Sequence, residues 1–512
     1  MLLIGIDIGT TSVKGVLIDN EGRLLGDASR VHDLISAQVG WAEEDPGIWW
    51  DGTLDVLRSL SGRASADGRA VRAISVSGMV PALILLDEYG RPVRRSIQQN
   101  DARAHDEIAY LQRTLDEREV FRLTGGGVNQ QTMPPKLLWL QAHEPDVFSA
   151  ARHIVGSYDY ITYRLTGRLT LERNWALESG MFDVRSETWI PAIIDAARIC
   201  QDMLPPVMSP GGIVGPLLKS VADEVGLGAD VVVTIGSGDH VASAFSSGVR
   251  SDGDVLIKLG GAGDILVCSD ALKYDQRVFI DYHLIPGKFL PNGCMASSGS
   301  LVKWFANSFF GPERAEFESD GRNFYAHLDG LAAGIPAGSD GLIVLPYFVG
   351  EKTPLMDPLA RGVFFGLSTY HTAAHVYRAI LEAVGYGFMD HLRVFQDMGL
   401  NPKRFFMSNG GAKSVLWRQI VTDIVGDAVE YITHHPGSSL GAAFVAGMGI
   451  GAFSSWGDIM EYIPDRTLME PDMAKHETYL AYFDVYRNLY RHLKQDFRDL
   501  AEAGARCAAS RE

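Results

Sequence analysis

The first residues able to do chemistry form the run 7–14, which reads DIGTTSVK. Apolar runs at 2–6 and 16–18 flank it and predict two strands joined by a glycine turn. Backbone N–H groups and hydroxyls in such a turn can hold phosphate oxygens, and the carboxylate of Asp7 can reach a hydrated Mg²⁺ beside them. The run therefore predicts a phosphate-binding hairpin, with a hairpin whose polar turn merely faces water as the structural alternative.

A second carboxylate, Asp239, follows a predicted buried strand at 231–235 and the residues Gly236-Ser237-Gly238. A helix is predicted after it, which would place the carboxylate at the positive end of a helix dipole. Phosphoryl transfer to an alcohol needs a carboxylate that accepts the hydroxyl proton, and an ordinary ionised aspartate can do this at neutral pH. Asp239 is therefore a candidate base, and a helix N-cap is the structural alternative.

The strand, glycine turn and strand of the opening hairpin recur about 250 residues later. Predicted strands at 254–259 and 265–268 enclose the turn GGAGD at 260–264, after a crossing rich in small residues at 248–253. Two similar domains could thus present two phosphate-binding hairpins across one cleft.

The elements that must position these residues alternate between strands and helices. Strands are predicted at 71–77, 83–87 and 342–345, and helices at 373–398 and 476–504. Asp45 and Pro46 should start another helix, whose Trp49 and Trp50 face the core.

Length and composition bound the class of protein. A chain of 512 residues, 46% hydrophobic and 21% charged, is typical of a globular protein with two large domains. The net charge of −17 argues against nucleic-acid and anionic-membrane partners. The four cysteines form no C-x-x-C pair, and neither a signal peptide nor a membrane span is evident, so a cytoplasmic location is expected.

Further motifs follow in order along the chain: GWAEEDP at 40–46, PKLLW at 135–139, GEKTP at 350–354, GVFFGL at 362–367 and GGAKS at 410–414. With the two hairpins and Asp239, they give the chain a resemblance to the FGGY carbohydrate kinases that runs nearly end to end. Within that family it is most similar to the xylulokinases.

The resemblance implies an α/β fold of two actin-like (ribonuclease-H-like) domains, with ATP and sugar in the cleft between them. The N-terminal domain, 1–249, would hold the sugar, the first phosphate hairpin and the base. The C-terminal domain, 250–512, would hold the second phosphate hairpin and the adenosine. The implied reaction is Mg²⁺-dependent transfer of the γ-phosphate of ATP to a hydroxyl of a sugar or polyol.

The resemblance also implies a role for each matching residue. Asp239 would be the catalytic base, and Asp7 would bind Mg²⁺ through water. The residues implied in ATP binding are Gly9, Thr10, Thr11, Ser12, Lys14, Gly260, Gly261, Gly410, Gly411, Ala412 and Ser414, although Lys14 fits a solvated strand lysine as well. The residues implied in sugar binding are Asn100, Asp101, Arg103, Met79 and His240.

The chain departs from the family pattern in both sites. Gly261 and Ala262 stand where the family commonly has a hydroxyl residue, and Asn409 replaces the first glycine of the adenosine turn; the charge of Lys258 could compensate in the first case. In the sugar site, MVPA at 79–82 stands where xylulokinases have Gln-Met-His-Gly, Gln99 replaces a Trp, and His240 replaces an Asn.

The expected function is an ATP-dependent kinase of a small ketose, with D-xylulose as the first expectation. Another ketopentose, a tetritol or a pentitol is the alternative, because the altered sugar site offers fewer polar contacts. An actin-like ATP-driven switch without sugar chemistry is a second alternative, and a degraded kinase that only binds ligand is a third. Whether the chain forms a homodimer is left open.

Overall fold

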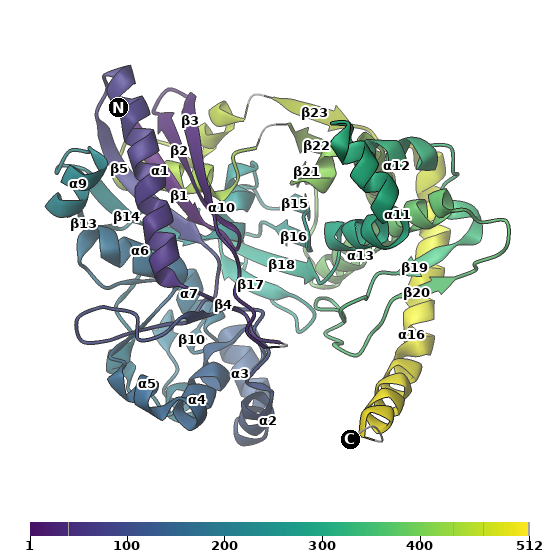
Figure 1. The fold of residues 1–512 in the computed structure, drawn as a ribbon, viewed down its shortest axis with the longest axis horizontal. Coiled ribbons are helices and arrows are strands. Elements are labelled where there is room, and N and C mark those ends of the chain that lie inside the picture. The colour runs from purple at the N-terminus through teal and green to yellow at the C-terminus, as the bar shows by residue number, and fades with distance from the viewer. Residues whose placement is uncertain (39, 434, 464, 510–512) are drawn as a thin grey trace. The chain divides into compact units, whose positions relative to one another are not determined.

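The computed structural model describes residues 1–38, 40–433, 435–463 and 465–509, with the side chains of 505 and 507–509 left out (Figure 1). The chain divides into two compact units. The first contains Met1–Arg250, Ile280–Leu290 and Pro436–Pro464, and the second contains the remaining segments. Two stretches beyond residue 250 thus return to the first unit, whereas the sequence placed all of 250–512 in the second domain.

The first unit is built on a six-stranded sheet in the order β13-β14-β5-β1-β2-β3. Its strands are β1 (Leu2–Ile8), β2 (Ser12–Asp19), β3 (Leu24–Val31), β5 (Val71–Gly78), β13 (Ile213–Pro216) and β14 (Val232–Gly238). Strands β1 and β14 both run parallel to β5, while β2, β3 and β13 are antiparallel to their neighbours. The carboxyl ends of β1, β5 and β14 therefore meet at one edge of the sheet.

Two helices pack on opposite faces of this sheet, and two glycines make room for them. Helix α1 (Pro46–Asp67) packs on β2 and β3, and α15 (Ser438–Gly449) packs on β1 and β5. A Cβ on Gly5 would lie 1.9 Å from the carbonyl oxygen of Ser439, and one on Gly15 would lie 2.5 Å from Val56 of α1. Since Gly5 pairs with Val16 and Gly15 pairs with Ile6, the two glycines face opposite sides.

The rest of the first unit consists of short elements. Its helices are α2 (His105–Thr114), α3 (Glu117–Thr124), α4 (Met133–His143), α5 (Pro145–Ala150), α6 (Ser157–Thr166), α7 (Arg173–Glu178), α8 (Pro191–Ala196), α9 (Lys219–Val225) and α10 (Asp239–Ser246), with 3-10 turns η1 (Gln201–Met203) and η4 (Trp456–Tyr462). Its short strands are β4 (Glu43–Glu44), β6 (Ile84–Leu86), β7 (Ser96–Ile97), β8 (His153–Val155), β9 (Leu171–Glu172), β10 (Phe182–Asp183), β11 (Thr188–Trp189) and β12 (Val207–Met208).

A seven-stranded sheet has the order β17-β18-β16-β15-β21-β22-β23, and its strands β15, β16, β21, β22 and β23 lie in the second unit, whereas residues 280–282 of β17 and 289–290 of β18 belong to the first. The strands are β15 (Asp254–Leu259), β16 (Gly263–Val267), β17 (Phe279–Tyr282), β18 (Phe289–Met295), β21 (Arg404–Ser408), β22 (Val429–Ile432) and β23 (Arg466–Met469). A separate hairpin pairs β19 (Ile343–Leu345) with β20 (Val363–Phe365). The helices are α11 (Gly299–Ser319), α12 (Phe324–Ala332), α13 (Ala373–Asp397), α14 (Val415–Val425) and α16 (Met473–Ala509), with 3-10 turns η2 (Ser339–Gly341) and η3 (Gly411–Lys413).

The strands and helices predicted from local sequence signals are present in the structure, which contains many further short elements. Asp45 caps α1 as expected, since its side chain accepts from the backbone N–H of Gly47, and Trp49 and Trp50 are buried. Strand β14 extends through Gly236–Gly238, beyond the predicted strand at 231–235, because parallel pairing with β5 reaches as far as Gly238. Among the described residues, no helix has the length and apolar character needed to cross a membrane.

Candidate active site

The carboxyl edge of the first sheet gathers the two carboxylates that the sequence singled out. Asp7 is the penultimate residue of β1, and Asp239 follows directly after β14, with only β5 between these two strands. Ser77, near the end of β5, donates its hydroxyl to Oδ1 of Asp7 at 2.9 Å. Ligands of open parallel sheets bind at this edge, so the topology brings both residues to a functional position.

Asp7 is buried, and its environment disfavours its charge. Burial, followed by the negative charge of Asp239, raises the pKa of Asp7 from 3.8 to about 6, while hydroxyls of Ser438 and Ser77 and the charge of Lys14 oppose the rise. Two carboxylates that repel each other in this way are a suitable site for a cation, which would favour the ionised form of both. The donor set therefore fits the hydrated Mg²⁺ expected from the sequence.

The turn between β1 and β2 has the predicted form. The N–H of Gly9 donates to the carbonyl of Ser12 at 3.1 Å and closes the turn. Thr10 and Thr11 are exposed at its tip, Ser12 is buried, and Lys14 is exposed on β2 opposite Asp7. Two hydroxyl residues and one lysine thus face solvent from the same hairpin.

Asp239 is the first residue of α10, and Gly238 occupies the N-cap position. The carboxylate accepts from the backbone N–H of His240 at 2.6 Å through Oδ1, and its side chain is 39% exposed. The N-cap alternative for Asp239 is therefore not what the structure shows. The residue lies at the positive end of a helix and remains accessible to a substrate.

The predicted sugar segment contains a buried ion pair. Asp101 accepts from the backbone N–H of Ala42 at 2.6 Å and from the guanidinium of Arg103 at 2.8 Å. Arg103 also donates to Glu43 at 2.8 Å and stacks 3.7 Å from the ring centre of Trp41. Burial opposes the charge of Asp101, but these hydrogen bonds outweigh it and hold the pKa of Asp101 below its usual range.

The flanking residues of this segment differ in exposure. Asn100 is exposed, and its carbonyl accepts from Gln130 at 2.6 Å. Lys136, part of the PKLLW motif, is buried beneath the segment and donates to the carbonyl of Gln98 at 2.9 Å. Burial lowers the pKa of Lys136 to about 7, against the attraction of Asp101. The sequence assigned no role to this lysine.

Met79 lies directly after β5, and its side chain is buried. Its N–H donates to the carbonyl of Ile8 at 2.9 Å, and its carbonyl accepts from the hydroxyl of Ser157 at 2.8 Å. Val80 is buried as well. These contacts place an apolar segment close to Asp7, as the departure from the xylulokinase pattern suggested.

His240 belongs to a cluster that sequence reasoning missed. Its Nε2 lies 2.9 Å from Oδ2 of Asp281 on β17 and 3.8 Å from Oε1 of Glu178 at the end of α7, and its Nδ1 lies 3.6 Å from Oδ1 of Asp239. The three partners lie on separate elements, β17, α7 and α10, so no local sequence motif predicts that they meet. The one sequence feature that pointed to this cluster is His240 itself, which directly follows Asp239 where xylulokinases have Asn.

The second hairpin, in the second unit, presents a turn without hydroxyls. The carbonyl of Gly260 accepts from Gly299 at 2.8 Å, and the carbonyl of Gly261 accepts from Ser298 at 2.9 Å, which ties the turn to the start of α11. Lys258 lies 3.3 Å from Asp264 on the opposite strand of the hairpin. The lysine suggested as compensation for Gly261 and Ala262 is thus engaged in a cross-strand ion pair.

The predicted adenosine turn follows β21, a parallel neighbour of β15. Asn409 has φ of 77°, a left-handed conformation that Asn tolerates better than most residues, so it can replace the family's glycine. Gly410 faces open space, whereas a Cβ on Gly411 would lie 2.5 Å from the ring of Trp417. Ala412 is buried, and the Ser414 hydroxyl accepts from the N–H of Trp417 at 3.0 Å and caps α14.

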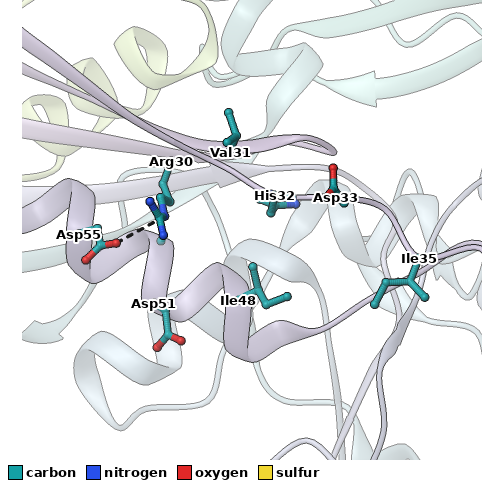
Figure 2. A pocket seen from close by; sticks show the side chains of 9 residues that line it. Arg30, Val31, His32, Asp33, Ile35, Ile48, Asp51 and Asp55 are labelled. Carbon is teal, nitrogen blue, oxygen red and sulfur yellow. Dashed lines mark ion pairs between the residues drawn. The ribbon is translucent and has the colours of Figure 1, made fainter.

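A separate cavity of about 440 Å³ lies beside the end of β3 and the start of α1 (Figure 2). Its lining residues are Arg30, Val31, His32, Asp33, Ile35, Ile48, Asp51, Gly52 and Asp55. The N–H of His32 donates to the carbonyl of Thr11 at 2.9 Å, so one wall adjoins the first phosphate turn. None of these residues was predicted as a site residue.

Comparison with known proteins identifies relatives that align with nearly the whole chain. The models of the N-terminal and C-terminal domains of the FGGY family of carbohydrate kinases match residues 2–246 and 276–450. A xylulose kinase of Staphylococcus epidermidis is 30% identical over 502 residues, covering 98% of each chain, and that of Escherichia coli is 30% identical over 495 residues, covering 96% of this chain and 99% of the other.

Solved structures agree with these relatives. The crystal structure of a xylulose kinase from Rhodospirillum rubrum has a TM-score of 0.91 and 42% identity, covering 97% of this chain and 100% of that chain. The predicted two-domain α/β fold is therefore confirmed, and ATP is the phosphate donor that the family implies. On this evidence the chain belongs to the FGGY family of carbohydrate kinases and is a phosphotransferase that acts on a sugar.

Proposed function

We propose that this enzyme transfers the γ-phosphate of ATP to a hydroxyl of D-xylulose. The observation that carries the proposal is the pair of mutually repelling carboxylates, Asp7 and Asp239, at the carboxyl edge of one sheet. One can accept a proton and the other can hold a cation. D-Xylulose is chosen because the relatives and the solved structure described above are named xylulose kinases.

In this proposal Asp239 is the general base. The substrate oxygen forms a bond to the γ-phosphorus while the bond from that phosphorus to the β–γ bridging oxygen breaks, and ADP leaves with the electron pair. The proton of the attacking hydroxyl passes to the carboxylate of Asp239, which is partly exposed and returns it to solvent.

Mg²⁺, held through water by Asp7, would neutralise charge on the phosphates. In the first unit, the groups proposed to hold phosphate are the N–H groups and hydroxyls of Gly9, Thr10, Thr11 and Ser12, with Lys14 as a cation on the same face as Asp7. In the second unit, backbone groups of Gly260 and Gly261 would bind phosphate and those of Gly410, Gly411 and Ala412 would bind adenosine, with Ser414 capping the start of α14.

The sugar would be bound by groups of the first unit. Asn100 is exposed and available as a donor and an acceptor, whereas Asp101 and Arg103 form the buried base of the segment. Met79 contributes an apolar wall, and His240 stands next to the base. This site offers few polar side chains, so another ketopentose or a tetritol or pentitol is the competing substrate.

The deciding experiment is ADP release with D-xylulose, D-ribulose, L-xylulose, erythritol and pentitols, each at saturating ATP and Mg²⁺. The proposal expects the highest kcat/KM with D-xylulose and negligible ADP release without an acceptor. A polyol preferred over every ketose would replace the substrate assignment. ATP turnover that is independent of every acceptor would favour the actin-like switch instead.

A further inference from the structure

Three elements of the first unit enclose the imidazole of His240. Asp239 and His240 form the first turn of α10, Glu178 ends α7, and Asp281 lies on β17. The closest contact joins Nε2 of His240 and Oδ2 of Asp281 at 2.9 Å, and Nδ1 lies 3.6 Å from Oδ1 of Asp239. Both ring nitrogens therefore face carboxylates.

The strand that carries Asp281 is fixed to α7 by paired hydrogen bonds. The side-chain amide of Asn174 donates to the carbonyl of Tyr282 at 3.0 Å and accepts from the N–H of Tyr282 at 2.8 Å. Arg173 donates to the carbonyl of His283 at 2.7 Å, and the ring of His283 contacts the carbonyl of Val249 at 3.0 Å. These hydrogen bonds fix the backbone next to Asp281, whose carboxylate lies against His240.

The charges around the ring favour an imidazolium. Burial alone would lower the pKa of His240, but Asp281, Asp239 and Glu178 raise it well above its ordinary value. Burial and then the charge of Asp281 raise the pKa of Glu178 well above its ordinary value, with smaller contributions from Asp239 and Glu172. The surroundings therefore favour the neutral form of Glu178 and the protonated form of the His240 ring, which lies against the carboxylate of Asp281.

We propose that His240 is a positioning residue for the base: anchored by Asp281, it orients the carboxylate of Asp239 and stabilises its ionised form. The contact of 3.6 Å is too long for a hydrogen bond, so the stabilisation is that of an ion pair. Since the imidazolium already carries its proton, it does not accept the substrate proton, which stays with Asp239. This inference rests on the proposed role of Asp239 and gives His240 a function other than a direct hydrogen bond to the sugar.

The test is the variant Asp281→Asn, which keeps the volume of the side chain and removes the charge that holds the imidazolium. An opposite charge within about 4–6 Å lowers the pKa of a carboxyl group by about 1–3 units. Losing it should therefore move the acid limb of the kcat–pH profile to higher pH by about 1 unit. We expect kcat measured at least one pH unit below the wild-type midpoint to fall by up to about 10-fold, with KM for ATP changed less than about twofold.

Three further variants keep the test decisive. His240→Asn should shift the acid limb in the same direction, and it covers the case in which Asp281→Asn does not fold. Asp281→Glu retains the charge and should recover part of the lost kcat. Glu178→Gln replaces a carboxyl group that is already neutral, so its shift should be smaller than that of Asp281→Asn.

The result that overturns the proposal is a folded Asp281→Asn or His240→Asn enzyme whose acid limb and kcat match those of the wild type. Asp239→Asn separates this failure from failure of the proposed function. If Asp239→Asn is inactive while Asp281→Asn is normal, only the positioning role is wrong. If Asp239→Asn remains active, the general-base assignment itself fails.

Discussion

Asp7 and Asp239 lie at the ends of two strands, β1 and β14, that are separated only by β5, and the charge of Asp239 raises the pKa of Asp7. Residues more than 200 positions apart in the chain thus form one electrostatic unit. A kinase needs both a proton acceptor and a cation site beside the phosphate, and this pair can provide them.

Asp239→Asn should lower kcat by about 100-fold or more, because the amide cannot accept the substrate proton although its volume is almost the same. Initial rates of ADP release at saturating ATP and acceptor give the measurement. Asp230→Asn is the matched control, since Asp230 is exposed and lies just before β14, at the other end of the strand from Asp239. If kcat for Asp239→Asn lies within about threefold of kcat for the control, Asp239 has a structural role and is not the base.

Asp7→Asn should stabilise the ligand-free protein at pH 7.5. The pKa of Asp7 is raised from 3.8 to about 6, so the stability it contributes is present below about pH 4 and is lost as pH rises through 6. Replacing the carboxyl group removes this loss, and the free energy of unfolding should rise by about 1–3 kcal/mol at pH 7.5 relative to wild type.

Urea unfolding at pH 7.5 and pH 4 measures this difference, which should nearly vanish at the lower pH. Equal differences at both values would show that titration of Asp7 is not its cause. The same variant should need more Mg²⁺ for half-maximal turnover, and an unchanged Mg²⁺ titration would remove Asp7 from the cation site.

Asp101→Ala should destabilise the fold by about 3–5 kcal/mol, because it leaves the buried guanidinium of Arg103 without its principal partner. Asn100→Ala is the control for stability, since Asn100 is exposed and its contact with Gln130 is made by its backbone carbonyl. Equilibrium unfolding of both variants measures the difference in their free energies of unfolding. If Asp101→Ala unfolds like the wild type yet no longer uses the sugar, its carboxylate serves the substrate more than the fold.

Asn409→Gly should leave both stability and KM for ATP close to wild type, because glycine accepts the φ of 77° without strain. Asn409→Ala places a Cβ in the same left-handed conformation and should cost about 1 kcal/mol. Thermal unfolding and ATP titration provide the comparison. A large gain in ATP affinity for Asn409→Gly would show that the asparagine side chain itself hinders the nucleotide.

The sequence predicted the parts of the site that depend on local pattern. The glycine turns after β1 and β15 were visible because short apolar runs and small residues determine them within a few positions. The contacts around His240 were not predicted, because Glu178, Asp281 and Asp239 meet only through the packing of α7, β17 and α10. The ion pair of Lys258 with Asp264 was not predicted for a similar reason, since Asp264 faces the lysine only once the hairpin is paired.

The segment after β5 leads to the last prediction, which concerns substrate discrimination. Met79 and Val80 are buried there, in place of the polar residues of the xylulokinase pattern. A polar contact left unpaired by an altered substrate costs about 1–3 kcal/mol, whereas an apolar wall tolerates the loss of a hydroxyl more easily. The enzyme should therefore discriminate weakly between D-xylulose and analogues that differ at distal hydroxyls. The ratio of kcat/KM values across the substrate panel measures this directly. D-Xylulose preferred over every analogue by about a thousandfold would contradict the prediction, since one such contact accounts for about 10–150-fold.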